Sequence, residues 1–397
     1  MTEVRTWRHF DYVLFIVTVL LAVYGVLMIY SANLGSLDPD LEFLWRRQAL
    51  VGGIGIGLIF LLAIFPRDYE WLGDFWWLAY LLAVVLLVLT YFFGSSEIGA
   101  VSGWLSLGFF NFQPSFLAMN LLAISVGAVL SRRRKGRASS TPMLFGAPKT
   151  SLLAEAPMER PDFVNYIASA VMAFVLVAFV FLQPDMATAA VLAFIWLAML
   201  FESDIPMRHL VFTGLLGLGA LVPLWNLTAD YPYVRDRIFG FINPGSDPDV
   251  AYQINQAAIA IGSGGLWGKG FAQGTQSQLR YLPVRHTDFI FSVVAEELGF
   301  VGVVVLFTLY LVLFLRLLRI ILLAPDTFGR LMVTGTLAMI LFQLVINVGM
   351  NLGMLPVAGL PLPLISYGNS ALLTTMIGIG LAENVAMRRA KLEFKGG

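Results

Sequence analysis

The most promising candidate for chemistry in this sequence is an acidic residue at the start of a long apolar run. His286, Thr287 and Asp288 are polar, and residues 289–315 are almost entirely apolar. A carboxylate at the mouth of a membrane helix lies near water and is partly desolvated, which suits a group that accepts a proton. The same position also suits a helix N-cap, because the helix dipole favours a carboxylate there. Position alone favours the cap.

Three further carboxylates lie in or beside apolar runs, where ionisable groups are costly and are candidates for function. Glu296 and Glu297 follow Asp288 by eight and nine residues, or about 12–14 Å along a helix axis. Paired carboxylates that act on one sugar are roughly 5–10 Å apart. We therefore expect the two glutamates to be neutral, or paired within the bundle, and to serve coupling or stability. Asp185 follows Pro184 at a turn and is equally consistent with a helix cap and with a site.

A glycine-rich segment with nearby cations precedes Asp288. Residues 260–270 allow the backbone to approach a ligand closely, but they lack the spacing and the ending of a Walker loop. Lys269, Arg280 and Arg285 could hold a diphosphate as charged donors. A flexible surface loop with solvated cations is the more ordinary interpretation, and the residues by themselves favour it.

A second irregular segment lies near the C-terminus. Residues 351–370 contain Pro356, Pro361 and Pro363 together with several glycines. Irregular backbone at membrane depth persists only where it lines protein or a wet cavity. We therefore expect a groove wall here, with a tight structural turn as the alternative.

The composition indicates that membrane-spanning helices position these candidates. Of the 397 residues, 58% are hydrophobic and 13% are charged, which is too little polar surface for a soluble domain. There is no cysteine, which excludes disulfides and thiolate metal sites, and a net charge of zero gives no indication of a nucleic-acid partner. A spanning helix needs about 20 apolar residues. Ten runs reach or approach this length: 11–30, 48–65, 75–93, 115–130, 163–182, 186–201, 210–226, 289–315, 330–350 and 365–386.

The positions of Lys and Arg predict how these spans are oriented. With both termini in the cytoplasm, 18 of the 25 Lys and Arg residues fall in inner segments, as the positive-inside rule requires. Residues 131–162 then form a basic cytoplasmic linker that sets the topology and contacts anionic lipid. Residues 227–287 form one large extracellular segment before the eighth helix. The prediction is an all-α polytopic membrane protein of about ten transmembrane helices, a single domain over 1–397.

Several short motifs, taken in order, resemble the SEDS family of peptidoglycan polymerases, which includes RodA and FtsW. The motifs are Trp104-Leu105-Ser106-Leu107-Gly108, Gln113-Pro114-Ser115, Gln183-Pro184-Asp185, Tyr252-Gln253, Gly262-Ser263-Gly264-Gly265, Gly274-Thr275-Gln276-Ser277, His286-Thr287-Asp288-Phe289-Ile290-Phe291, Ala295-Glu296-Glu297, Gly359-Leu360-Pro361-Leu362-Pro363 and Ile365-Ser366-Tyr367-Gly368. They recur across nearly the whole chain, and ten spans agree with the architecture of the family. Residues 273–279 and 347–351 are closer to the RodA branch than to FtsW.

The resemblance implies a reaction and its participants. SEDS proteins polymerise lipid II at the outer face of the cytoplasmic (inner) membrane. The C4 hydroxyl of an acceptor sugar displaces undecaprenyl diphosphate from the anomeric carbon of the donor chain, with inversion. The proposed catalytic aspartate of the family corresponds to Asp288, which would act as a general base. The implied partners are lipid II, the nascent glycan, membrane lipids and a class B penicillin-binding protein that crosslinks the strands.

The other expected site residues surround this aspartate or supply charge. Diphosphate is a good leaving group, so the site should offer cations or a metal to hold the developing charge. No cofactor is evident; a divalent Mg or Mn ion is compatible with the reaction, although no His/Asp/Glu cluster with ligand spacing occurs. The substrate-binding candidates are Arg47, Gln113, Ser115, Lys269, Thr275, Gln276, Ser277, Arg285, His286, Thr287, Ser366 and Tyr367.

The sequence departs from the family pattern around the fourth span. Gly103, Phe116 and Met119 stand where the family has Arg, Glu and Lys, and Ala187 and 369–371 depart as well. The absence of both Glu and Lys is consistent with the replacement of a buried ion pair by two apolar residues. Such a replacement can be neutral for the stability of the fold. Two other functions stay open: a transporter of lipid-linked precursors built on broken helices, and a catalytically weak scaffold for the penicillin-binding protein.

Overall fold

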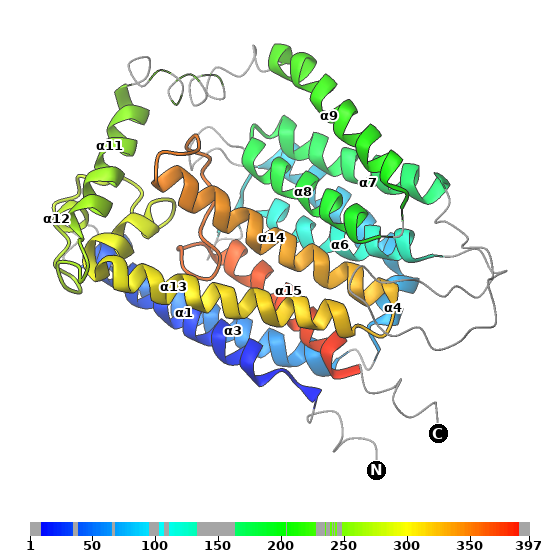
Figure 1. The fold of residues 1–397 in the computed structure, drawn as a ribbon, viewed down its shortest axis with the longest axis horizontal. Coiled ribbons are helices and arrows are strands. Elements are labelled where there is room, and N and C mark those ends of the chain that lie inside the picture. Colours follow the sequence, from blue (N-terminus) through cyan, green and yellow to red (C-terminus); the bar gives the residue numbers. More distant parts are fainter. Residues whose placement is uncertain are drawn as a thin grey trace.

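The computed structural model is a bundle of long helices that run roughly parallel to one another (Figure 1). It describes residues 9–34, 39–65, 68–94, 103–106, 111–132, 163–203, 205–227 and 248–388, together with 235, 239, 241 and 243. The helices are α1 (Tyr12–Asn33), α2 (Pro39–Glu42), α3 (Leu44–Ile64), α4 (Glu70–Asp74), α5 (Trp76–Phe93), α6 (Pro114–Ser131), α7 (Phe163–Leu182), α8 (Met186–Glu202), α9 (Met207–Leu227), α11 (Pro248–Ser263), α12 (Thr275–Gln278), α13 (Ile290–Leu323), α14 (Thr327–Asn351) and α15 (Asn369–Arg388). Two short strands, β1 (Leu105–Ser106) and β2 (Asn111–Phe112), pair antiparallel.

Each of the ten apolar runs coincides with a helix, so the prediction of an all-α polytopic membrane protein is confirmed. Within the described residues, eight helices are long and apolar enough to cross a membrane. Of the remaining two, α8 is shorter, with 17 residues, and α9 contains Pro223. Most of the predicted linker, residues 133–162, and residues 228–234 of the outer segment lie outside the described part of the chain.

The centre of the bundle is formed by α6, α14 and α15. Almost every residue of α6 and α15 is buried, whereas α5 exposes most of its apolar side chains, as expected for a helix that faces lipid. Phe116 and Met119 lie in the core, 4% and 0% exposed. The two positions at which the resemblance led us to expect charges are therefore filled here by buried apolar side chains.

The start of α1 and the end of α15 lie at the same end of the bundle. The backbone N–H of Asp11 donates to Glu383 Oε2 at 2.9 Å. Asp11 also caps α1 by accepting from Leu14 N–H at 3.1 Å, and it binds Arg316 of α13 through two carboxylate oxygens. Both ends of the described chain therefore reach one face, which agrees with termini on a single side of the membrane.

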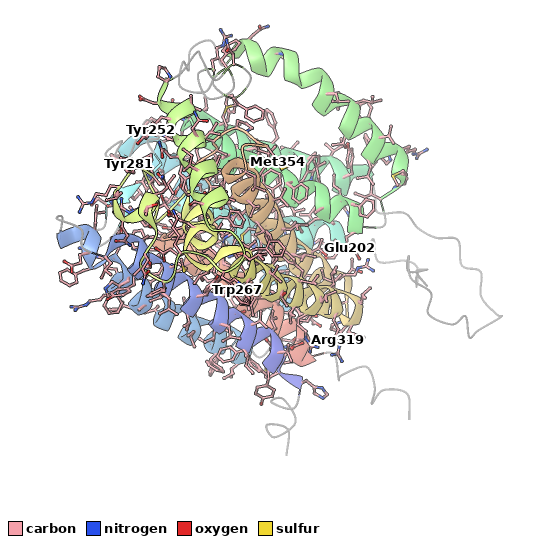
Figure 2. The ribbon with its side chains drawn as sticks, turned by 60° about the vertical axis from the view of Figure 1, so that its left-hand side comes forward. Glu202, Tyr252, Trp267, Tyr281, Arg319 and Met354 are labelled. Carbon is pink, nitrogen blue, oxygen red and sulfur yellow. The ribbon has the colours of Figure 1, made fainter. Side chains whose placement is uncertain are left out.

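The opposite end of the bundle carries α11, α12 and the irregular segments before α13 and α15. Figure 2 shows Tyr252 and Tyr281 toward this end, and Glu202 and Arg319 toward the other. We call this end, which holds the turn at Asp288, the outer end. Helix α13 runs between the two ends and is broken at Gly299, where φ is 64° and ψ is −163°.

Candidate functional site

Asp288 lies in a turn immediately before α13 and is half-buried. Helix α13 begins at Ile290, and its N-cap position is Phe289, whose side chain makes no capping hydrogen bond. The interpretation of Asp288 as the cap is therefore wrong. The physical reason is that neighbouring elements hold the backbone of this turn, as the following contacts describe.

Three consecutive carbonyls of the turn accept hydrogen bonds from other segments. The carbonyl of His286 accepts from Tyr367 N–H at 2.8 Å. The carbonyl of Thr287 accepts from Ser366 Oγ at 2.6 Å. The carbonyl of Asp288 accepts from two side-chain amides of α14, at 3.0 and 2.9 Å. Hydrogen bonds at three successive residues fix the backbone of the turn. They therefore also fix the direction in which the side chain of Asp288 extends from the backbone.

The segment that holds this turn is the irregular stretch before α15. Gln48 of α3 donates to the carbonyl of Ser366 at 3.0 Å and accepts from Gly368 N–H at 3.3 Å. Ser366 Oγ also accepts from Leu362 N–H at 2.7 Å. The proline- and glycine-rich stretch therefore supports the Asp288 turn by hydrogen bonds, and the expectation that it lines a groove stays a prediction.

The electrostatics of the turn are set by two neighbouring bases. Arg285 is buried, and its Nε donates to the carbonyl of Ala32 at 2.5 Å. Burial, together with the charge of Arg280, lowers the pKa of Arg285. Burial and the charge of Arg285 lower the pKa of His286 to about 4. His286 is therefore a neutral imidazole near pH 7, and its ring lies edge-on to that of Tyr367, with centroids 6.0 Å apart.

A second group of polar residues surrounds Glu296, which is completely buried. Its Oε1 accepts from Lys269 Nζ at 2.8 Å, from Thr275 Oγ1 at 3.1 Å and from Gln276 N–H at 2.9 Å. Its Oε2 accepts from Ser277 N–H at 3.3 Å. A buried carboxylate with a cation and several donors is compensated, as burial of a charge requires. Glu296 is therefore paired, one of the two expected states.

Glu297 fixes the same loop from the other side. Its Oε2 accepts from Ser31 Oγ of α1 and, at 3.1 Å, from Ala272 N–H. Its Oε1 accepts from Ser277 Oγ at 3.3 Å. Together the two glutamates, which we call the glutamate pair, join α13, the loop before it and the end of α1. The carbonyl of Ala32, next to Ser31, accepts a hydrogen bond from Arg285. Helix α1 therefore contacts both the glutamate pair and the Asp288 turn.

The loop at 264–270 completes the broken helix α13. Phe300 and Val301 N–H donate to the carbonyls of Gly265 and Leu266 at 2.9 and 3.1 Å. In the other direction, Lys269 and Gly270 N–H donate to the carbonyls of the glutamate pair, both at 3.0 Å. A break in a membrane helix frees backbone groups that must be satisfied by protein. The glycine-rich loop satisfies them, so its glycines serve backbone packing.

Asp185 takes the helix-cap role. It is the N-cap of α8 and accepts from Thr188 N–H at 3.1 Å. Its other oxygen accepts from Gln113 Nε2 at 2.9 Å, and Gln113 N–H donates to Ser370 Oγ at 2.9 Å. Asp185 therefore ties α8 to the starts of α6 and α15.

Burial divides the predicted substrate-binding residues into two groups. Gln113, Ser115, Ser277 and Ser366 are between 0% and 6% exposed, so their side chains have almost no surface to offer a sugar. We assign them to the support of the site. Arg47 and Thr275 are exposed, and Lys269, Gln276, His286, Thr287 and Tyr367 are partly so.

The sequence reasoning missed four residues that build the site. Gln48 and Ser31 hold the two irregular segments, and Asn347 and Asn351 donate to the carbonyl of Asp288. One available signal was the spacing of the two asparagines, one turn apart on an apolar helix, since buried amides need partners. Within the described residues, no group of three or more His, Asp or Glu side chains is placed to hold a metal ion.

The fold and this turn define a class: polytopic helical membrane proteins with an acidic turn at one end of the bundle. The chain matches the FtsW/RodA/SpoVE family, described as "Cell cycle protein", over residues 11–391. It is 36% identical to peptidoglycan glycosyltransferase MrdB of Escherichia coli (strain K12), over 97% of this chain and 95% of that protein. It is 31% identical to peptidoglycan glycosyltransferase RodA of Treponema pallidum (strain Nichols), over 98% of this chain and all of that protein.

Two solved structures have the same fold. The crystal structure of the Thermus thermophilus rod shape determining protein RodA matches with a TM-score of 0.66 at 31% identity, over 96% of this chain and 97% of that one. A chain of a peptidoglycan synthase complex, described for the coordination of polymerization and crosslinking, matches with a TM-score of 0.74 at 31% identity, over 96% and 98%. The chain belongs to the FtsW/RodA/SpoVE family and is a multi-pass membrane protein of the inner membrane.

Proposed function

We propose that this protein is a peptidoglycan glycosyltransferase that polymerises lipid II. Membership of the family, and the activity named for relatives along nearly the whole chain, support the reaction class. The observation that carries the proposal is the turn at Asp288, which is half-buried at the outer end and is held at three successive carbonyls. A general base must be positioned before its basicity matters.

The proposed reaction is a single displacement. The C4 hydroxyl of the acceptor sugar forms a bond to the anomeric carbon of the donor chain, and the bond from that carbon to the diphosphate oxygen breaks. Undecaprenyl diphosphate leaves with the bonding electrons, and the anomeric configuration inverts. The carboxylate of Asp288 accepts the proton of the attacking hydroxyl. A positioned base contributes about 10²–10⁴-fold, and the remaining acceleration comes from aligning two lipid-linked substrates.

The cations at the outer end are proposed to hold the diphosphate. Arg285 lies three residues before Asp288, with its Nε on a backbone carbonyl, and Arg47 is exposed on α3 next to Gln48, which anchors the irregular stretch. Charged donors placed at a leaving group stabilise its developing charge. The exposed and half-buried residues Thr275, Gln276, His286, Thr287 and Tyr367 are proposed substrate contacts around this centre.

The proposed partner is a class B penicillin-binding protein that crosslinks the strands. The similarity to a chain of a synthase complex supports an assembly of this kind. Placement of the polymerase beside a transpeptidase would deliver new glycan directly to crosslinking, at the outer face of the inner membrane.

The test is reconstitution of the purified protein in vesicles with labelled lipid II. The proposal predicts glycan strands whose formation stops when Asp288 is replaced, with chelator as an added arm that reports a requirement for a divalent cation. Movement of labelled lipid II across the bilayer without strand formation would identify a transporter. Absence of strand formation both with and without the penicillin-binding protein would identify a scaffold.

A further inference from the structure

The side chain of Asn351 stands where the first turn of α13 would otherwise close. In a regular α-helix the N–H of residue 292 would donate to the carbonyl of residue 288. Here Ser292 N–H donates to the carbonyl of Phe289 at 3.1 Å and also to Asn351 Oδ1 at 3.2 Å, and Asn351 Nδ2 donates to the carbonyl of Asp288 at 2.9 Å. The carboxamide of Asn351 therefore bridges Ser292 N–H and the carbonyl of Asp288. The helix begins at Ile290, and Asp288 stays outside it.

A second contact fixes the orientation of this carboxamide. Ser292 Oγ donates to Asn351 Oδ1 at 2.7 Å. Because Oδ1 only accepts and Nδ2 only donates, an Oδ1 that is occupied by Ser292 turns Nδ2 toward Asp288. Asn351 is also completely buried, so water does not compete for either group.

Asn347 makes a parallel contact one turn earlier on α14. Its Nδ2 donates to the carbonyl of Asp288 at 3.0 Å and to the carbonyl of Leu360 at 2.8 Å. Asn347 is completely buried as well. The two amides occupy both lone pairs of one carbonyl, and through Leu360 they join the Asp288 turn to the irregular stretch before α15.

We propose that Asn351, supported by Asn347, is a positioning residue for Asp288 in glycosyl transfer. The inference rests on the proposed function. By keeping Asp288 out of the cap position, Asn351 prevents the first-turn N–H groups from drawing the carboxylate to the helix end, where they would stabilise its charge and weaken it as a base. It also fixes the backbone from which the carboxylate extends, and a base displaced by about 1 Å loses on the order of 10² in rate.

The experiment compares Asn351→Ala, Asn351→Asp and Asn347→Ala with the matched control Gln343→Leu. Gln343 is a buried amide two turns earlier on α14 whose one hydrogen-bond contact in the described structure is to Met119 Sδ. Asn351→Asp keeps the volume and the acceptor for Ser292 but removes the donor to Asp288. Two readouts are taken on the full-length protein: kcat and KM for lipid II, and amide hydrogen exchange in a peptide that covers residues 286–293.

The expected result is a kcat lowered at least tenfold in both Asn351 variants, with KM within about twofold of wild type, and faster exchange in 286–293. Asn347→Ala should show a smaller change of the same kind, and Gln343→Leu should match wild type. A kcat within twofold of wild type for both Asn351 variants would overturn the inference. Equal losses in the Gln343 variant, or a loss confined to KM, would also overturn it, because either would indicate general loosening of the bundle or a binding role.

Failure of the proposed function has a different signature. In that case either the wild-type protein would form no strands from lipid II or the Asp288→Asn variant would form them at the wild-type rate, whereas exchange in 286–293 would still respond to Asn351 alone. The two readouts therefore separate an error about Asp288 as the base from an error about what holds it.

Discussion

The ammonium of Lys269 lies 2.8 Å from Oε1 of Glu296. The lysine side chain is 26% exposed and the glutamate is completely buried, so the contact is an ion pair with its anion inside the protein. From the sequence, Lys269 was a candidate for holding a diphosphate. The contact shows a cation that compensates a buried carboxylate beside the site, and the diphosphate role stays a prediction.

The first prediction concerns this pair. Lys269→Met should lower the free energy of unfolding by about 1–3 kcal/mol, the cost of removing a partner from a buried polar group. Adding Glu296→Gln should recover part of this loss, because the uncompensated charge is then gone. Thermal unfolding in detergent of the two single variants and the double variant measures the coupling.

The same variants separate a structural lysine from a substrate-binding one. If Lys269 acts through Glu296, polymerisation should recover along with stability in the double variant. A double variant that is as stable as wild type but has a strongly raised KM for lipid II would return Lys269 to the substrate-binding set.

The second prediction concerns the break in α13. A Cβ on Gly299 would lie 2.3 Å from the backbone nitrogen of Gly268, and φ is 64° with ψ at −163°, a conformation that is essentially confined to glycine. Gly299→Ala should therefore destabilise the protein by at least about 1–3 kcal/mol and loosen the loop at 264–270. Gly262→Ala is the matched control, since nothing lies within 4 Å of its Cβ position in α11. Equal thermal stabilities for the two variants would contradict the close backbone packing described here.

The third prediction concerns pH and His286. The pKa of this histidine is lowered from 6.5 to about 4 in the folded protein, so between these values the unfolded chain binds a proton that the folded protein does not. Its contribution to stability is complete above about pH 6.5 and is lost as the pH falls toward 4, at up to about 1.4 kcal/mol per pH unit.

Melting temperatures measured at pH 7.5 and pH 5 test this contribution. His286→Gln should lose less stability between the two pH values than wild type. An identical pH dependence for His286→Gln and wild type would show that the imidazole is solvated in the folded protein.

The helices were predictable from sequence because each is a long apolar run, and length and composition suffice to identify a span. Asp288 was recognisable for a similar reason, since it interrupts the pattern at the start of such a run. Its surroundings were not. Gln48 and Ser366, which are hydrogen-bonded, are 318 residues apart in the sequence, and Asn351 and Ser292 are 59 residues apart. No local sequence pattern predicts contacts between residues so far apart.

The glutamate pair shows a related limit. Its burial followed from its place in an apolar run, but its partners depend on the break at Gly299 and on the loop that crosses it. Three neighbouring residues named as substrate contacts in that loop, Thr275, Gln276 and Ser277, all donate hydrogen bonds to the carboxylate of Glu296. A motif shows that residues matter together without showing whether they face a ligand or each other.

The central claim is that the carboxylate of Asp288 accepts a proton during glycosyl transfer. The most direct measurement is the initial rate of strand formation from lipid II by purified Asp288→Asn, beside Asp249→Asn as a matched change at the outer end. Asparagine keeps the shape of the side chain and leaves the three carbonyl contacts of the turn intact, so the fold should be preserved. The account predicts a rate lowered by about 10²–10⁴-fold for Asp288→Asn and little change for Asp249→Asn; a folded Asp288→Asn variant that polymerises at the wild-type rate would contradict it.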